Sequence, residues 1–153
     1  MKKLYIKETL QLNSLNDLIH DEYLNLDDLK YDREKDIVDL PFWRIFHYYN
    51  PPRIIKRGLL SKIGEVDVLR CNLQIKNVQK YDVFDNSRIG TYSFNGVQYD
   101  PNSKVLKFIT NEDCNIDIAI NNIQIEYVEL EYRGKARIRY WIFGESTDSK
   151  IYD

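Results

Sequence analysis

The chain has 153 residues, of which 43% are hydrophobic and 30% are charged, and its formal net charge is −2. These values are typical of one soluble globular domain, so residues 1–153 are treated as a single domain with its own core. The small negative charge gives no general attraction for nucleic acid or an anionic membrane, and no apolar run approaches the roughly 20 residues of a membrane span.

Composition also favours β-structure in a reducing compartment. Tyr is abundant, with 12 residues, whereas the chain has only 6 Gly and 4 Pro, and Tyr, Ile and Val are residues that favour strands. The first residues, MKKLYIKETL, carry charges where a secretory signal peptide needs an apolar core. We therefore expect a cytoplasmic protein in which Cys71 and Cys114 are reduced thiols inside strands.

Alternating apolar and polar residues, separated by turn residues, predict strands along the first 109 residues. Alternation with a period of two means that one face of a strand is buried. Ser14 followed by Asp17 resembles a capping box and indicates one short helix. The predicted elements are a strand within 4–10, the helix near Ser14, a hairpin of 23–31 and 36–42, a strand containing 69–75, and a hairpin of 94–99 and 104–109.

The stretch from Cys114 to Phe143 is predicted to form three consecutive antiparallel strands. Asn121-Asn122 fits a two-residue hairpin turn, and Gly134 gives backbone freedom for a second turn at residues 133–135. This register matches apolar with apolar residues and Glu with Arg. It pairs Ile120 with Ile123, Ile118 with Ile125, Tyr127 with Trp141, Glu129 with Arg139, and Glu131 with Arg137.

Two pairs of segments resemble each other in the same order along the chain. Residues 26–40 resemble 94–108 at an offset of 68, and CNLQI from Cys71 resembles CNIDI from Cys114 at an offset of 43. We hypothesise an internal duplication, with halves at about residues 18–84 and 86–143. The alternative is that any two hairpins share alternation and turn residues. If the duplication is real, the first half carries an insert of 25 residues at about 41–64.

Residues 41–64 are the candidate site, because they contain five Lys and Arg, several aromatic residues, and no Asp or Glu. Arg, Tyr and Trp dominate interface hot spots, and basic residues among aromatics also suit phosphate-bearing ligands or single-stranded nucleic acid. The overall acidity disfavours nucleic acid. The alternative is a core strand followed by solvated loop charges. The candidate partner-binding residues are Trp43, Arg44, Tyr48, Tyr49, Arg53, Lys56 and Arg57.

Motifs for catalysis or metal binding are sparse. His20 precedes Asp21, but adjacent side chains usually diverge, and His47 stands among aromatic residues with no ligand spacing between the two histidines. We therefore predict no cofactor, no metal and no catalytic residues. The alternative is a barrel or sandwich that binds or hydrolyses a small ligand, with His20, Asp21, His47 and tyrosines lining a cavity.

Together these observations predict an all-β protein, mainly antiparallel, built as a two-sheet sandwich or a partly open barrel with one short N-terminal helix. The predicted function is that of a non-enzymatic interaction protein. The basic and aromatic insert would dock an acidic protein partner. A third hypothesis is an assembly role that uses exposed strand edges of 114–143. The oligomeric state has no signature in the sequence.

Overall fold

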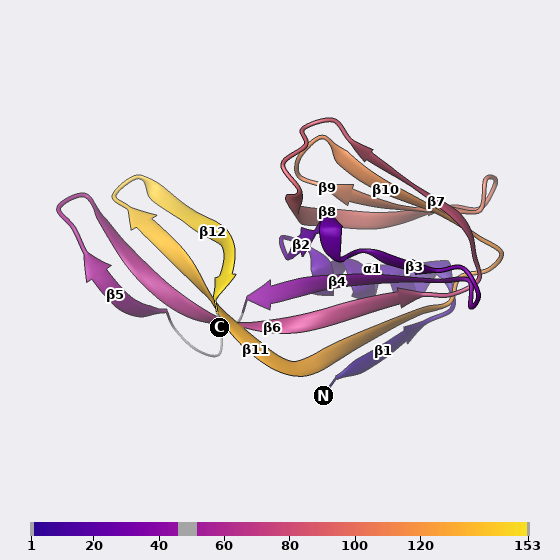
Figure 1. Cartoon of the computed structure of the whole chain (residues 1–153), viewed down its shortest axis with the longest axis horizontal. Coiled ribbons are helices and arrows are strands. Elements are labelled where there is room, and N and C mark those ends of the chain that lie inside the picture. The colour runs from indigo at the N-terminus through magenta and orange to yellow at the C-terminus, as the bar shows by residue number, and fades with distance from the viewer. Residues whose placement is uncertain (1, 46–51, 153) are drawn as a thin grey trace.

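Figure 1 shows a computed structural model of the chain, which describes the backbone of residues 2–45 and 52–152 and the side chains in that range outside 131–133, 145 and 147–152. The described residues form twelve strands, one α-helix and two short 3-10 helices. None of these helices is long and apolar enough to cross a membrane. The elements are β1 (Lys3–Ile6), η1 (Thr9–Gln11), α1 (Leu12–Ile19), β2 (Tyr23–Asn25), η2 (Leu26–Asp28), β3 (Lys30–Asp32), β4 (Ile37–Ile45), β5 (Arg53–Arg57), β6 (Ser61–Ile75), β7 (Val78–Asp85), β8 (Thr91–Asp100), β9 (Val105–Thr110), β10 (Cys114–Ile120), β11 (Ile125–Trp141) and β12 (Gly144–Tyr152).

The strands form one antiparallel sheet that folds over into two layers. The strand order is β1-β11-β6-β4-β2-β8-β9-β10-β7, with β3, β5 and β12 attached to β4, β6 and β11. The short strand β2 pairs with β4 on one side and with β8 on the other, so it carries the sheet from the lower to the upper layer in Figure 1. The predicted all-β, mainly antiparallel fold is confirmed, and the sheet is open rather than a closed barrel.

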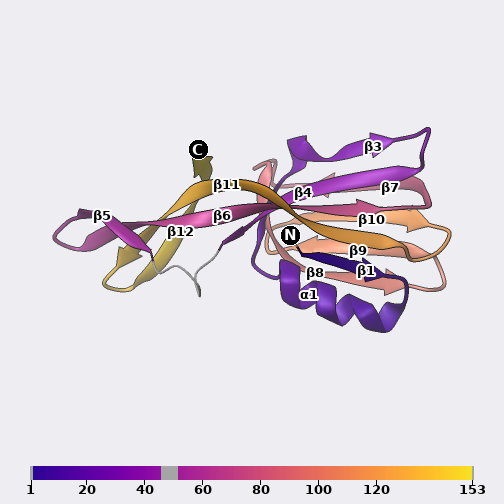
Figure 2. The ribbon, with the colours of Figure 1, turned by 90° about the horizontal axis from the view of Figure 1, so that it is seen from below.

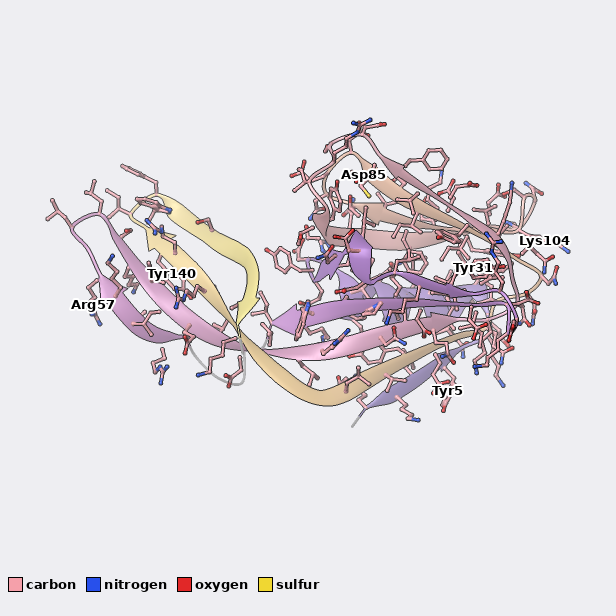
Figure 3. The ribbon with its side chains drawn as sticks, viewed as in Figure 1. Tyr5, Tyr31, Arg57, Asp85, Lys104 and Tyr140 are labelled. Atoms are coloured by element: carbon pink, nitrogen blue, oxygen red, sulfur yellow. The ribbon has the colours of Figure 1, made fainter. Side chains whose placement is uncertain are left out.

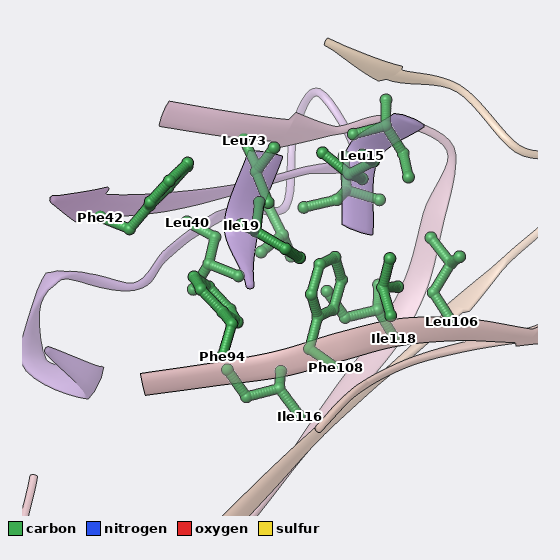
Figure 4. Close-up of a cluster of buried hydrophobic side chains, with 14 of the residues drawn as sticks. Leu15, Ile19, Leu40, Phe42, Leu73, Phe94, Leu106, Phe108, Ile116 and Ile118 are labelled. Atoms are coloured by element: carbon green, nitrogen blue, oxygen red, sulfur yellow. The ribbon is translucent and has the colours of Figure 1, made fainter. Parts of the chain in front are cut away.

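The main core fills the space between the two layers. Phe42 from the lower layer meets Phe94 from the upper layer edge to face, with ring centroids 5.6 Å apart, and Figure 4 shows Leu40 and Leu73 beside them. Such aromatic contacts add to the free energy gained by removing apolar surface from water. Both cysteines are buried in this core as free thiols.

Helix α1 closes one flank of the sandwich (Figure 2). Its apolar residues Leu12, Leu15 and Ile19 lie on one face of the helix and are buried. The Asn16 side chain accepts a hydrogen bond from Val97 N (2.7 Å) and donates one to Val97 O (3.2 Å). The helix therefore provides hydrogen-bond partners for the backbone N–H and C=O of Val97 in β8. The helix position was predicted, but the capping box is formed by Glu8 and Gln11 of η1 and not by residues 14 and 17.

The predicted meander of Cys114–Phe143 is wrong. Strand β10 pairs with β7 and β9 in the upper layer, whereas β11 pairs with β6 and β1 in the lower layer. Asn121 and Asn122 therefore belong to a connection between layers and not to a hairpin. The alternating isoleucines are buried as expected, but those of the two strands reach the same core from opposite sides. Apolar residues facing each other across layers produce the same sequence pattern as apolar residues paired in a ladder.

The second predicted turn, at residues 133–135, is also absent, because β11 continues through it for 17 residues. Gly134 lies opposite Val68 of β6, next to a shift in register between Glu129 and Arg133. The predicted Glu–Arg ladder does not form. Instead, Arg137 lies opposite Glu65, and Arg139 lies opposite Ile63. The glycine marks an irregularity inside a strand rather than a turn.

Both predicted hairpin turns are present, although η2 interrupts the first predicted strand. Asp32 pairs with Ile37, and Asp100 pairs with Val105. Each turn ends with a residue in the left-handed region, Asp36 at φ 56° and Lys104 at φ 54°. These positions differ by 68, the offset between the similar segments.

The strand that follows each hairpin also pairs in an equivalent register. Leu40 lies opposite Leu73, and the positions that correspond to them at the two offsets, Phe108 and Ile116, lie opposite each other. A duplication would place the two strands in such equivalent registers. The duplication itself stays a prediction.

Two strands extend beyond the sandwich and form a projecting arm. In β6 the buried positions change from Val66 and Val68 to Leu69 and Cys71, so the buried face of the strand switches sides. In β11 the buried positions likewise change from odd to even numbers, with Ala136 and Ile138 buried. We call residues 52–68 and 134–152 the arm, and the other described residues the body. Figure 1 shows the arm, formed by β5, β12 and the adjoining parts of β6 and β11, projecting from the body.

Candidate docking surface

The arm differs from the body in charge. Its sequence has eight Lys and Arg against four Asp and Glu, whereas the rest of the chain has fourteen against twenty. The arm is therefore a positively charged projection from a negatively charged body. A charge separation of this size steers association with a partner of opposite charge.

One face of the arm sheet is apolar and covered. Val66, Val68, Ala136 and Ile138 form a small core that is separate from the main one. Trp43 and Ile45 from the end of β4 and Tyr140 pack against it. Gly64 lies on this face, where an added Cβ would come within 2.9 Å of Pro52 and 3.0 Å of Tyr140. We call this side the inner face of the arm.

The opposite, outer face carries most of the cations. Cross-strand pairing places Arg53 and Arg137 on either side of Glu65, and Lys56 and Arg139 on either side of Ile63. Side chains that lie opposite each other in a ladder share one face of the sheet. The basic residues that lie on this face are Arg53, Lys56, Lys135, Arg137 and Arg139.

Glu65 neutralises part of this charge. Its Oε1 atom lies 2.6 Å from Arg53 Nη2 and 3.4 Å from Lys135 Nζ. Burial favours the protonated carboxyl, but the two cations outweigh it and hold the pKa of Glu65 below its ordinary value. Lys56 and Arg139 lie beyond this cluster, toward the end of the arm, and both are exposed.

The end of the arm is an exposed apolar cluster on two adjacent turns. Ile142 N donates a hydrogen bond to Leu60 O at 3.3 Å, which joins the β5–β6 turn to the β11–β12 turn. Leu59 is 98% exposed and Phe143 is 94% exposed. Clustered exposed apolar side chains, in contrast to single ones, mark interaction sites. We call this cluster the tip, and it consists of Leu59, Leu60, Trp141, Ile142 and Phe143.

Basic side chains surround the tip. The Arg139 guanidinium lies 5.2 Å from the centre of the Trp141 ring, and Lys62 Nζ lies 5.5 Å from that of Tyr140. Arg57 ends β5 just before the turn that carries Leu59, and Figure 3 shows Arg57 and Tyr140 on the arm, away from the body. The tip therefore combines aromatic and aliphatic contact area with a basic border.

At the base of the arm, Arg44 belongs to a polar network instead of an exposed surface. Its Nη1 atom donates to Tyr127 Oη at 3.0 Å and to Glu129 Oε1 at 3.1 Å. Tyr127 Oη in turn donates to Glu129 Oε1 at 2.9 Å and lies 3.5 Å from Cys71 Sγ. On the other side, Arg44 Nε is 3.6 Å from Glu22 Oε1. One cation thus lies between two carboxylates, and only 24% of its side chain is exposed.

Burial shifts the titration of this network. It raises the pKa of Glu22 to about 7, despite the N–H that Ile45 donates to this carboxylate at 2.9 Å and the nearby Arg44. It also raises the pKa of the Cys71 thiol to about 12 and that of the Tyr127 phenol above its usual value. Because this pKa is about 7, Glu22 is only partly ionised near neutral pH, which reduces the cost of burying its carboxyl beside Arg44.

The structure divides the candidate residues predicted from the sequence into three groups. Arg53, Lys56 and Arg57 lie exposed on β5 of the arm. Trp43 and Arg44 lie near the end of β4, at the base of the arm. The Trp43 ring centre is 5.8 Å from Arg70 Cζ, and Arg44 belongs to the polar network with Glu22, Tyr127 and Glu129. Trp43 and Arg44 do not share an exposed face with the β5 residues. Tyr48 and Tyr49 lie outside the described residues.

Sequence reasoning missed half of the surface, because that half comes from β11. The residues that reach the arm because β11 pairs with β6 are Lys135, Arg137, Arg139 and Trp141. The predicted hairpin had instead paired Arg137 with Glu131, Arg139 with Glu129 and Trp141 with Tyr127, and had placed Lys135 in the turn. The signal in the sequence was that the apolar positions change from even numbers up to Val68 to odd numbers from Leu69 onward. This change indicates that the strand buries one face in one core and then its other face in a second core.

The residues predicted for the alternative small-ligand site do not line a common cavity among the described residues. His20 Nδ1 and Asp21 Oδ1 do meet, at 3.1 Å, contrary to the expected divergence. However, 56% and 74% of these side chains are exposed, and His47 lies outside the described residues. An open depression of about 240 Å³ lies on β8, β9 and β10, lined by Gln98, Tyr99, Asp100, Ser103, Val105, Lys107 and Asp117.

Among the residues that the structure describes, no cluster of three His, Cys, Asp or Glu has the geometry to hold a metal ion. Comparison of the chain with protein-family models, curated proteins and solved structures finds no match. The functional proposals therefore rest on the chemistry and geometry of the arm.

Proposed function

We propose that the protein is a non-enzymatic interaction protein whose arm docks an acidic protein partner. The observation that carries this proposal is the gathering of exposed cations around an apolar tip on a projection from an acidic body. Electrostatic complementarity of this kind accelerates encounter and selects the partner by charge. Apolar contacts at the centre of an interface then supply most of the affinity.

The residues at the tip have the composition of an interface centre. Trp141 and Phe143 offer large rings, and Arg139 holds its guanidinium over one of them. Trp and Arg are enriched among the side chains whose truncation costs most in protein complexes. The cations on the outer face form a polar border that an acidic partner would neutralise.

A protein partner fits these residues better than nucleic acid does. Binding nucleic acid requires many cations that neutralise consecutive phosphates, and the acidic body would repel the phosphates that extend beyond the arm. On the outer face, Glu65 already engages Arg53 and Lys135. A compact acidic patch on a protein needs only the cations around the tip.

The test is capture of a partner from the producing cell, with nuclease treatment to remove nucleic acid. The test variant combines Lys56→Glu, Arg57→Glu and Arg139→Glu, which reverses charge around the tip and leaves the Arg53–Glu65 pair intact. The control variant combines Lys7→Glu, Lys30→Glu and Lys107→Glu, which makes the same charge change at exposed sites on the body.

We expect the wild type and the control variant to capture the same acidic protein and the test variant to lose it. Exposed charges contribute little to stability, so the melting temperatures should remain similar. Capture that is equal for all three proteins contradicts a role of the arm. Capture that disappears equally in both variants indicates a response to net charge and also contradicts it.

A further inference from the structure

Strand β7 of the body and the loop after it carry further exposed apolar side chains, and acidic rather than basic residues predominate beside them. On β7 and the loop after it, Val83, Phe84 and Ile89 are 38%, 52% and 60% exposed. Hydrogen bonds join Asn86 to Asp113, which brings the acidic turn before β10 beside this loop. We call these residues the β7 patch. It consists of Val83, Phe84 and Ile89 with Asp82, Asp85, Glu112 and Asp113, and these four acidic residues outnumber the neighbouring cations Lys80 and Arg88.

The β7 patch also lies on a sheet edge that is available for pairing. Strand β7 is the last in the sheet order and pairs with β10 alone among the described strands. Proteins usually protect such an edge with charged or twisted residues, because its free N–H and C=O groups can bind another strand. Here Val83 and Phe84 point to opposite faces of the strand, and both remain exposed beside the edge between the acidic residues Asp82 and Asp85.

Within one chain the tip and the β7 patch lie apart, the tip at the far end of the arm and the patch on the upper layer of the body, where Figure 3 labels Asp85. One molecule therefore presents two complementary surfaces, one apolar and basic and the other apolar and acidic. Two separate exposed apolar clusters of opposite charge on the same protein favour contact between copies.

We propose that the acidic partner of the arm is a second copy of this chain, with the tip of one copy seated on the β7 patch of the other. This inference rests on the proposed function, since it names the partner of the same surface. In a two-fold dimer each copy supplies one tip and one β7 patch, so both contacts form at once and the assembly closes. Arg57, Lys62 and Arg139 around the tip face the carboxylates of the patch, while the apolar residues bury each other.

The first experiment measures the mass of the full chain by size-exclusion chromatography with light scattering over a wide range of concentration. The tip variant is Leu59→Ser with Phe143→Ser, and the patch variant is Phe84→Ser with Ile89→Ser. The control variant, Tyr5→Ser with Leu10→Ser, changes side chains that are 54% and 80% exposed elsewhere on the body. We expect twice the monomer mass for the wild type and the control, and the monomer mass for the tip and patch variants.

The second experiment locates the contact by cross-linking, with one substitution in each surface. Cys71 and Cys114 are buried, so single cysteines can be introduced at exposed positions and oxidised to a disulfide by an added oxidant. Mixing the Phe143→Cys and Phe84→Cys proteins should give a covalent dimer of the two. Mixing Phe143→Cys with Leu10→Cys should give none.

A wild type that stays monomeric at every concentration overturns this inference. The proposed function then stands or falls separately on the capture of another acidic protein by the arm. A dimer that survives both the tip and the patch variants overturns the inference as well, and so does a dimer that only the tip variant abolishes, because the β7 patch would then not be its partner.

Discussion

Replacing Glu22 by glutamine tests the electrostatics at the base of the arm. The carboxyl of Glu22 is 14% exposed, lies 3.6 Å from Arg44 Nε and accepts the N–H of Ile45. Burial raises its pKa from 4.5 to about 7 in the folded protein. The unfolded chain releases this proton near pH 4.5, whereas the folded protein keeps it until about pH 7. The folded state therefore loses stability relative to the unfolded state as the pH rises through this window.

The size of this loss follows from the shift. One pKa unit corresponds to about 1.4 kcal/mol, so the full difference is roughly 3 kcal/mol, of which roughly 2–3 kcal/mol falls between about pH 5 and about pH 8. Glutamine carries no charge at any of these pH values, so it removes this dependence. The amide oxygen of the introduced glutamine can still accept the Ile45 N–H, which limits the structural effect of the change.

The assay is the free energy of unfolding from urea denaturation at about pH 5 and about pH 8 for the wild type, Glu22→Gln and Glu34→Gln. Glu34 lies exposed in the β3–β4 turn and controls for loss of a carboxylate. We expect the wild type and Glu34→Gln to lose about 2–3 kcal/mol more than Glu22→Gln over this range. Parallel losses for all three proteins would refute the burial of a protonated Glu22.

Two further predictions concern the core and the thiols. Phe94→Ala should lower the free energy of unfolding by about 3–5 kcal/mol, because Phe94 is fully buried against Phe42. As a control, Phe84→Ala at an exposed position should cost less than about 1 kcal/mol in the monomer. Similar urea midpoints for the two variants would contradict this prediction. Burial raises the pKa of Cys71 to about 12 and that of Cys114 to about 11. Both thiols should therefore resist a disulfide reagent at about pH 8 until denaturant is added. Rapid reaction of the folded protein with the reagent would contradict this prediction.

Much of the local structure could be read from the sequence. Alternation identified the buried residues of β8, β9, β10 and the body half of β6, because a strand places every second side chain on the same face. Asp32 and Asp100 marked the two hairpin turns, where their carboxylates accept backbone N–H groups. The acid-free segment before Gly64 also led to Arg53, Lys56 and Arg57, which lie exposed on the arm.

Only the tertiary structure decided which strand pairs with which. The alternation around Asn121 states which side chains are buried, but it is equally compatible with two strands in one ladder and with two strands in facing layers. The layered arrangement holds here because it lets both strands bury their isoleucines in one core. Gly134 likewise fits a turn or an irregular strand, and the local sequence does not distinguish them.

The candidate surface depends on the same choice. Arg137 and Arg139 join Arg53 and Lys56 only because β11 continues straight along β6 and leaves the body with it. Pairing over so many residues is a long-range contact, whose free energy depends on both strands and not on either sequence alone. The sequence by itself determined which residues are apolar, charged and suited to turns, and the packing of two cores on opposite faces of one sheet decided which of them meet on the arm.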